Sequence, residues 1–186
     1  MDNYPKSVTK SQTQIIFNQM NNSFYKIQGK DIKLGIGVFC KIKIKNKSIF
    51  VLMTSYYLID EIYIEQNDEI KIIINNQLSL IKFGDKRLKY INKELNLTVI
   101  EINENKKFKI NFLEMDESVY EEESILNNKD SIYIIHHNNT DKEIYVSYGI
   151  IRYINKYEIS LSCNINSNGT LAPIFNLKNN KITPFS

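Results

Sequence analysis

The sequence has no apolar run that approaches the roughly 20 residues needed to span a bilayer, so we expect no membrane segment. Its first residues also lack a basic stretch followed by an apolar core, the pattern of a secretory signal. We therefore expect a cytoplasmic protein. Only two cysteines are present, Cys40 and Cys163, and a reducing compartment predicts that both are free thiols.

Histidine is equally scarce, since His136 and His137 are the only two in the chain. Adjacent residues at the end of a strand point to opposite faces, so this pair cannot easily share a metal ion. We expect no metal site and no cofactor. The simplest interpretation places both histidines in a surface turn.

The basic residues are not gathered in one block. The net charge is +3, and lysine and glutamate are interleaved along the chain, which argues against a nucleic-acid-binding surface. The most basic stretch, "KIKIKNK" at 41–47, alternates lysine with isoleucine. This alternation is typical of a half-buried strand with its lysines in water.

With 186 residues, the chain is long enough for one large domain or two small ones. Residues 7–22 carry apolar side chains at Val8, Ile15, Ile16 and Met20, which predicts an amphipathic helix. From Tyr25 onward, short runs rich in isoleucine, valine and tyrosine alternate with turn residues, which is typical of an all-β sandwich or barrel.

This pattern divides the chain into an N-terminal helical arm (1–22), a first β-barrel (23–113), an acidic linker with a possible short helix (114–130) and a second β-barrel (131–186). The strands expected in the first barrel are 35–44, 48–54, 61–65, 69–74, 77–83 and 97–103. The strands expected in the second barrel are 131–136, 143–154, 157–163, 172–177 and 180–185.

Four segments carry a recognisable motif order: "GIGVFCKI" (35–42), "VLMTSYYLID" (51–60), "KELNLTVIEI" (93–102) and "CNINSNGTLAPIFNLKNNKI" (163–182). They resemble, in the same order, four segments of trypsin-like serine proteases: G-T-G-F-F, V-L-M-T-N-N-H-V-I-D, D-(I/L)-(A/T)-(I/V)-I-E-I, and the nucleophile loop G-S-S-G-S-P with the strand after it. The resemblance implies an all-β, chymotrypsin-like double β-barrel with a short N-terminal helix.

The resemblance also implies that the catalytic positions are replaced. Tyr57 occupies the position of the histidine base, and a phenol is a poor proton acceptor at neutral pH. Asn96 occupies the position of the aspartate that orients this base. Thr170 occupies the nucleophile position and keeps a hydroxyl, but a hydroxyl without a base is a poor nucleophile.

The loop that would form the oxyanion hole is altered as well. Its N–H groups would belong to Asn168 and Thr170, and Leu171 replaces the glycine that follows the nucleophile. After the loop, Pro184 removes an amide donor from the expected last strand. Because the sequence stops at Ser186, we expect the second barrel to be incomplete.

These residues suggest an inactive homologue of trypsin-like serine proteases that acts as a binding or regulatory module for a protein or peptide partner. One alternative is an active serine-type endopeptidase that uses His136 or His137 as a non-standard base. Another is a structural or partner-binding β protein in which an exposed strand edge or the N-terminal helix docks on another chain. In structural terms, we interpret Tyr56 and Tyr57 as packing residues and Asn96 as a residue that caps or turns the chain before its strand. The sequence leaves the oligomeric state open.

Overall fold

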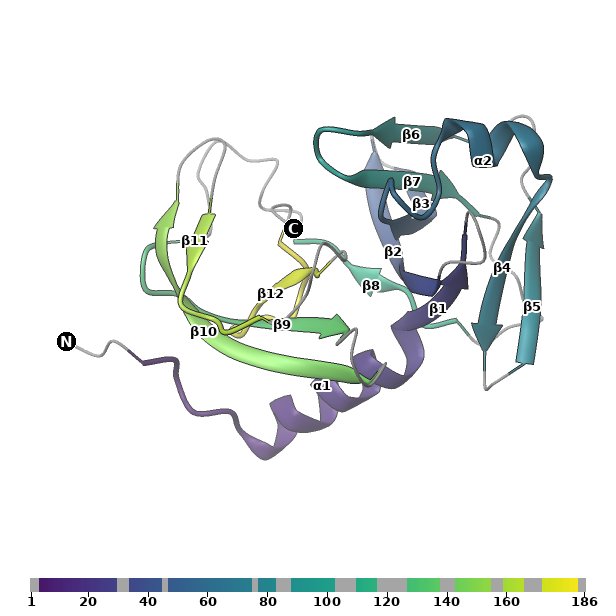
Figure 1. The fold of residues 1–186 in the computed structure, drawn as a ribbon. Helices are drawn as coiled ribbons and strands as arrows, with labels where there is room; N and C mark the ends of the chain where they lie inside the picture. Colours follow the sequence, from purple (N-terminus) through teal and green to yellow (C-terminus); the bar gives the residue numbers. More distant parts are fainter. Residues whose placement is uncertain are drawn as a thin grey trace. The chain divides into compact units, whose positions relative to one another are not determined.

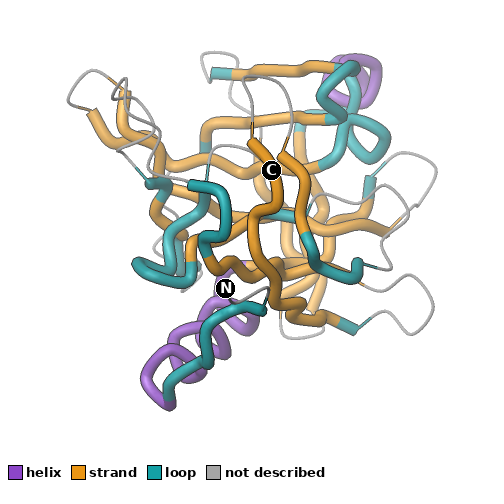
Figure 2. Tube along the Cα trace, turned by 90° about the vertical axis from the view of Figure 1, so that its left-hand side faces the viewer, coloured by secondary structure: helices purple, strands orange, loops and turns teal. Residues whose placement is uncertain are grey.

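The computed structural model describes residues 4–29, 34–44, 47–74, 77–82, 88–102, 110–116, 127–137, 143–154, 159–165 and 172–183. The chain divides into two compact units, which are Asn21–Leu113 and the combination of Met1–Met20 with Glu114–Ser186. Strands predominate among the described residues of both units, which also contain the helices α1 and α2 (Figures 1 and 2). The expected all-β class with a short N-terminal helix is confirmed.

The unit formed by Asn21–Leu113 is built on one antiparallel sheet with the order β5-β4-β1-β2-β3-β7-β6, and β8 pairs with β2. The strands are β1 (Phe24–Gln28), β2 (Leu34–Ile44), β3 (Lys47–Thr54), β4 (Glu69–Ile74), β5 (Gln77–Lys82), β6 (Lys89–Asn92), β7 (Leu97–Glu101) and β8 (Leu113–Glu114). The sequence pattern predicted β2, β3, β4, β5 and β7 but missed β1, β6 and the short β8.

The expected strand at 61–65 is wrong, because Glu61–Gln66 forms helix α2. Asp60 is the N-cap of this helix, and its side chain accepts a hydrogen bond of 2.7 Å from the backbone N–H of Tyr63. Such an aspartate satisfies one of the free N–H groups of the first turn. The Asp60 cap therefore favours a helix although isoleucine and tyrosine alternate as in a strand. Tyr63 is the residue that this helix buries.

The core of this unit consists mostly of isoleucine and other large apolar residues, as the period-2 alternation of the strands predicts. In β2, Lys41 and Lys43 are exposed while Ile42 between them is half-buried. The buried cluster contains Ile27, Phe39, Leu52, Leu58, Ile59, Tyr63, Ile70, Ile72, Ile81, Ile100 and Ile102.

The second unit contains an antiparallel sheet with the order β11-β10-β9-β12. Its strands are β9 (Ser131–His137), β10 (Ile144–Ile154), β11 (Ile159–Leu161) and β12 (Ile174–Asn176). The buried cluster on this sheet includes Ile132, Ile134, Ile151 and Ile174. The expected strand at 180–185 is wrong within the described residues, because Ile182 makes only isolated bridges there.

Helix α1 (Lys10–Ser23) is attached to this second sheet by amide side chains. Gln12 Nε2 donates to the carbonyl of Leu177 at 2.8 Å, and Gln19 Nε2 donates to the carbonyl of Asn180 at 2.9 Å. Gln19 Oε1 accepts a hydrogen bond of 2.7 Å from the hydroxyl of Tyr133. The helix is therefore held in place by polar contacts.

The apolar face expected for α1 is only partly correct. Ile16 is buried, at 3% exposure, and Met20 is half-buried, but Ile15 is 39% exposed. The short helix expected in the acidic segment falls mainly on residues 117–126, which lie outside the described residues. Neither described helix is both long enough and apolar enough to cross a membrane.

Candidate functional site

The turn after β3 presents the residue in the histidine position of the protease motif. At the end of the strand, Thr54 is fully buried, and its Oγ1 donates to the carbonyl of Ile36 at 2.8 Å. The carbonyl of Ser55 then accepts hydrogen bonds from the N–H groups of Leu58 and Ile59, at 3.0 and 3.1 Å. These bonds close a helical turn immediately after the strand, and Tyr57 lies within it.

Asn96 lies in the connection between β6 and β7 and contacts this turn. It has a φ of 49°, in the left-handed region that asparagine tolerates better than most residues. The prediction that Asn96 is a turn residue before its strand is confirmed. Its carbonyl accepts a hydrogen bond of 3.3 Å from the N–H of Tyr56.

The side chain of Asn96 strengthens this junction through Ser55. Ser55 Oγ donates to Asn96 Oδ1 at 2.7 Å and accepts from the N–H of Tyr57 at 3.2 Å. The same N–H lies 3.4 Å from Asn96 Oδ1. We call Ser55, Tyr57 and Asn96 the turn junction. The sequence motif placed Tyr57 and Asn96 in it, whereas nothing in the sequence singled out Ser55.

The side chain of Tyr57 points into solvent. It is 66% exposed, and its ring makes an edge-to-face contact with Tyr56 at a centroid distance of 5.8 Å. The interpretation of Tyr57 as a packing residue is therefore wrong. Chemically, the junction provides a phenol, an alcohol and a neutral amide, and none of these groups is a good general base at neutral pH.

The structure describes only the end of the segment that resembles the nucleophile loop. Asn168, Thr170 and Leu171 lie outside the described residues, so their assigned roles stay predictions. Ala172 is half-buried and Pro173 is buried, directly before β12.

His136 lies in strand β9 and is only 5% exposed, so the prediction of a surface turn is wrong for this residue. Its Nε2 atom is 2.9 Å from Ser147 Oγ, and Ser147 Oγ donates to the carbonyl of Asn164 at 2.9 Å. The imidazole also stacks on Tyr145 at a centroid distance of 6.1 Å. Burial lowers the pKa of His136, which favours the neutral ring.

The hydrogen-bond pattern determines which nitrogen of His136 carries the proton. Because Ser147 gives its one hydrogen to Asn164, the imidazole must donate from Nε2. The buried Nδ1 is then an acceptor, and it has no hydrogen-bond partner among the residues that the structure describes. In this arrangement His136 cannot take a proton from Ser147. The pair is a structural contact in a region where the sequence shows no motif.

Both cysteines are free, as predicted. Cys40 is buried, and burial raises its thiol pKa. Cys163 is half-buried, and burial raises its pKa to about 11. Both thiols are therefore protonated at neutral pH and poor nucleophiles. Within the described residues, no group of three or more His, Cys, Asp or Glu side chains is placed to hold a metal ion.

No protein-family model matches the sequence, and no curated protein sequence does. Solved structures do match. Deg5 aligns at a TM-score of 0.61 with 14% identity, over 92% of this chain and 82% of the other. The inactive form of Rv3671c protease aligns at 0.60 with 8% identity, over 95% and 84% of the two chains.

A serine-to-alanine mutant of Rv3671c from M. tuberculosis H37Rv, also an inactive form, aligns at a TM-score of 0.58 with 8% identity, over 95% of this chain and 80% of the other. At such low identities the likeness concerns the fold. The chain has the chymotrypsin-like fold of trypsin-like serine proteases.

Proposed function

We propose that this chain is an inactive homologue of trypsin-like serine proteases that works inside the cell as a binding or regulatory module. The turn junction is the observation that supports the proposal. Tyr57 and Asn96 come from separate parts of the sequence and meet where the motif order puts a base and its orienting acid. Under this proposal the chain keeps the position of the protease site but not the residues that perform acyl transfer.

The size of the expected defect follows from the chemistry. Loss of the histidine or the serine in subtilisin lowers kcat about 10⁶-fold. Here an exposed phenol stands in the base position, and the amide oxygen of Asn96 already accepts the hydrogen bond from Ser55. A threonine without a base would hydrolyse peptides at a rate too low to detect.

The test is a comparison of the purified chain with its Thr170→Ala variant, prepared in the same way. We expect equal background rates on casein and on a peptide library, and no adduct at Thr170 after exposure to a fluorophosphonate. Labelling of Thr170, or hydrolysis that disappears in Thr170→Ala, would refute the proposal.

The second candidate function is a peptidase that uses His136, and the 2.9 Å contact between its Nε2 and Ser147 Oγ is the observation in its favour. The direction of the Ser147 hydrogen bond argues against it. If this function were correct, the same fluorophosphonate would label Ser147, and both Ser147→Ala and His136→Gln would abolish hydrolysis. We expect neither result.

We propose a protein or peptide as the partner. Strand β5 ends the first sheet within the described residues, and its Leu78 and Leu80 are 59% and 44% exposed. An exposed strand at the end of a sheet can pair with an added strand. Replacing both leucines by lysine should abolish partner binding, whereas Leu88→Lys, which changes an exposed leucine outside β5, should not.

A further inference from the structure

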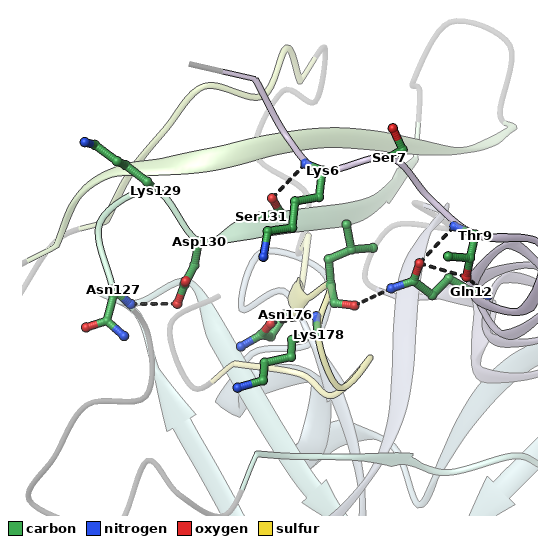
Figure 3. Close-up of a pocket in the computed structure, with 11 residues that line it drawn as sticks. Lys6, Ser7, Thr9, Gln12, Asn127, Lys129, Asp130, Ser131, Asn176 and Lys178 are labelled. Carbon is green, nitrogen blue, oxygen red and sulfur yellow. Dashed lines mark hydrogen bonds between the residues drawn. The ribbon is translucent and has the colours of Figure 1, made fainter. Parts of the chain in front are cut away.

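A polar pocket lies within the unit that contains the second sheet. Its volume is about 390 Å³, and three segments line it: the chain before and at the start of α1, the turn that precedes β9, and the end of β12 (Figure 3). Volumes of this order are common for small-molecule sites in proteins. The protease resemblance assigns no role to the residues that line this pocket.

Specific hydrogen bonds hold the walls of the pocket together. The backbone N–H of Lys6 donates to Ser131 Oγ at 2.9 Å, which joins residues 125 positions apart. Thr9 and Gln12 form a reciprocal capping pair, in which Thr9 N–H donates to Gln12 Oε1 and Gln12 N–H donates to Thr9 Oγ1. Gln12 also donates to the carbonyl of Leu177. The pocket is therefore formed before any ligand arrives.

Asn176 is the most informative residue in the pocket. It is only 3% exposed, and its Oδ1 accepts a hydrogen bond of 2.8 Å from the N–H of Lys178. Within the described part of the chain, no protein group accepts a hydrogen bond from its Nδ2. Figure 3 shows this nitrogen directed into the pocket. Because this nitrogen opens onto the pocket, a ligand or water in the pocket can accept its hydrogen bond.

The charges around Asn176 are mainly positive. Figure 3 shows the ammonium groups of Lys6 and Lys178 on the same side as the Asn176 amide, whereas Lys129 points away. Neither Lys6 nor Lys178 forms an ion pair with a carboxylate among the described residues. One carboxylate is present, that of Asp130, whose Oδ2 accepts a hydrogen bond of 2.8 Å from the N–H of Asn127.

We propose that this pocket binds a small organic anion that carries both an acidic group and hydroxyl groups. The carboxylate or phosphate of the ligand would lie between Lys6 and Lys178 and accept from Asn176 Nδ2. A ligand hydroxyl would donate to Asp130 Oδ1. Two ammonium groups disfavour a cation, and an apolar ligand would leave the buried Asn176 amide unsatisfied.

Isothermal titration calorimetry on the full chain tests the proposal with four probes: gluconate, glycerol 3-phosphate, inorganic phosphate and glycerol. We expect saturable binding of gluconate or glycerol 3-phosphate, weaker binding of inorganic phosphate and none of glycerol. The stronger of the first two identifies the acidic group. Saturable binding of none of the four, or binding of inorganic phosphate alone, would overturn the proposal.

Asn176→Asp is the decisive variant, because it keeps an acceptor for the N–H of Lys178 while it replaces the free donor by a negative charge. We expect the Kd to rise at least about tenfold, since the lost hydrogen bond involves a charged group. Lys178→Met should act in the same direction. Lys71→Met, which removes an exposed lysine from the other unit, is the matched control and should leave the Kd unchanged.

Folding of each variant is checked by its circular dichroism spectrum and thermal midpoint. If Asn176→Asp folds like the parent and binds the anion equally well, the pocket is not the binding site and the proposal fails. Asp130→Asn tests the hydroxyl contact separately. It should weaken gluconate or glycerol 3-phosphate but not inorganic phosphate, and equal effects on both would contradict the assigned role of Asp130.

Discussion

The backbone N–H of Tyr57 lies 3.4 Å from Asn96 Oδ1, and Ser55 Oγ forms a hydrogen bond with both groups. Two loops that are remote in sequence are joined in this way without any charged side chain. The sequence resemblance assigns these two positions to the imidazole and the carboxylate of an active protease. Here the contact is made mainly through the backbone of Tyr57, which makes it a structural feature that mutagenesis can probe.

The first prediction concerns Asn96, which has both a side-chain role and a left-handed backbone. Asn96→Gly removes the hydrogen bond to Ser55, but glycine adopts the left-handed backbone conformation without strain. We therefore expect the free energy of unfolding to fall by about 1 kcal/mol. Asn96→Ala also has a Cβ in the left-handed region, which costs about 1 kcal/mol more. Urea unfolding measures both values, and an alanine variant as stable as the glycine variant would contradict this.

The second prediction concerns the protease positions directly. Because the Tyr57 side chain is exposed and Asp keeps an oxygen acceptor for Ser55, both Tyr57→His and the double variant Tyr57→His with Asn96→Asp should fold. The introduced imidazole should have a higher pKa in the double variant, since a nearby carboxylate favours the imidazolium. Proton NMR titration measures the difference. Equal pKa values would show that the two side chains do not approach each other.

The third prediction concerns the close approach of Gly29 to the turn that follows β3. A Cβ at Gly29 would collide with the backbone carbonyl of Leu58, which cannot shift without moving the turn. A Cβ at Gly37 would instead meet the terminal methyl groups of Ile27 and Leu52. We expect Gly29→Ala to cost about 2 kcal/mol or more and Gly37→Ala to cost less. Urea unfolding of the two variants tests this order.

The fourth prediction concerns the attachment of α1. The Tyr133 hydroxyl donates to the buried Oε1 of Gln19, and the Tyr133 ring stacks on Phe175 at 4.8 Å. Tyr133→Phe keeps the stacking but leaves an unsatisfied acceptor, which should cost about 1 to 2 kcal/mol. Tyr148→Phe is the matched control, because Tyr148 is 38% exposed and its hydroxyl has no hydrogen-bond partner among the described residues. Thermal unfolding should show a loss only for Tyr133→Phe.

The fifth prediction is a pH dependence caused by His136. Burial lowers its pKa in the folded chain below the usual 6.5, so the unfolded chain binds a proton more readily. The stability associated with neutral His136 is therefore present above about pH 6.5 and is lost as the pH falls below that value toward the lowered pKa of the folded chain. His136→Gln should reduce this loss relative to the parent, while His137→Gln should retain it. An unchanged slope in His136→Gln would refute the assignment.

The resemblance predicted which residues would meet but not how. The motif order in "VLMTSYYLID" and "KELNLTVIEI" placed Tyr57 near Asn96, because in this fold β3 and β7 are neighbours. Ser55 was missed, since a serine before two tyrosines has no signal of its own. Its role depends on an Asn96 oxygen that comes from 41 residues further along the chain.

The sequence by itself determined the features that depend on local periodicity: the all-β class, most strands of both sheets, the N-terminal helix and the half-buried alternation of lysine and isoleucine in β2. It misassigned 61–65 because the same residues satisfy a strand pattern and a capped helix, and the aspartate cap favoured the helix.

Only the tertiary structure decided which polar groups are buried and what they contact. His136 is buried against Ser147 and Tyr145 because β9 pairs with β10 along its whole length, and strand pairing is a long-range contact. The pocket around Asn176 joins Lys6 to Ser131 across 125 residues. Local sequence patterns carry no information about such contacts, because they depend on how distant segments pack together.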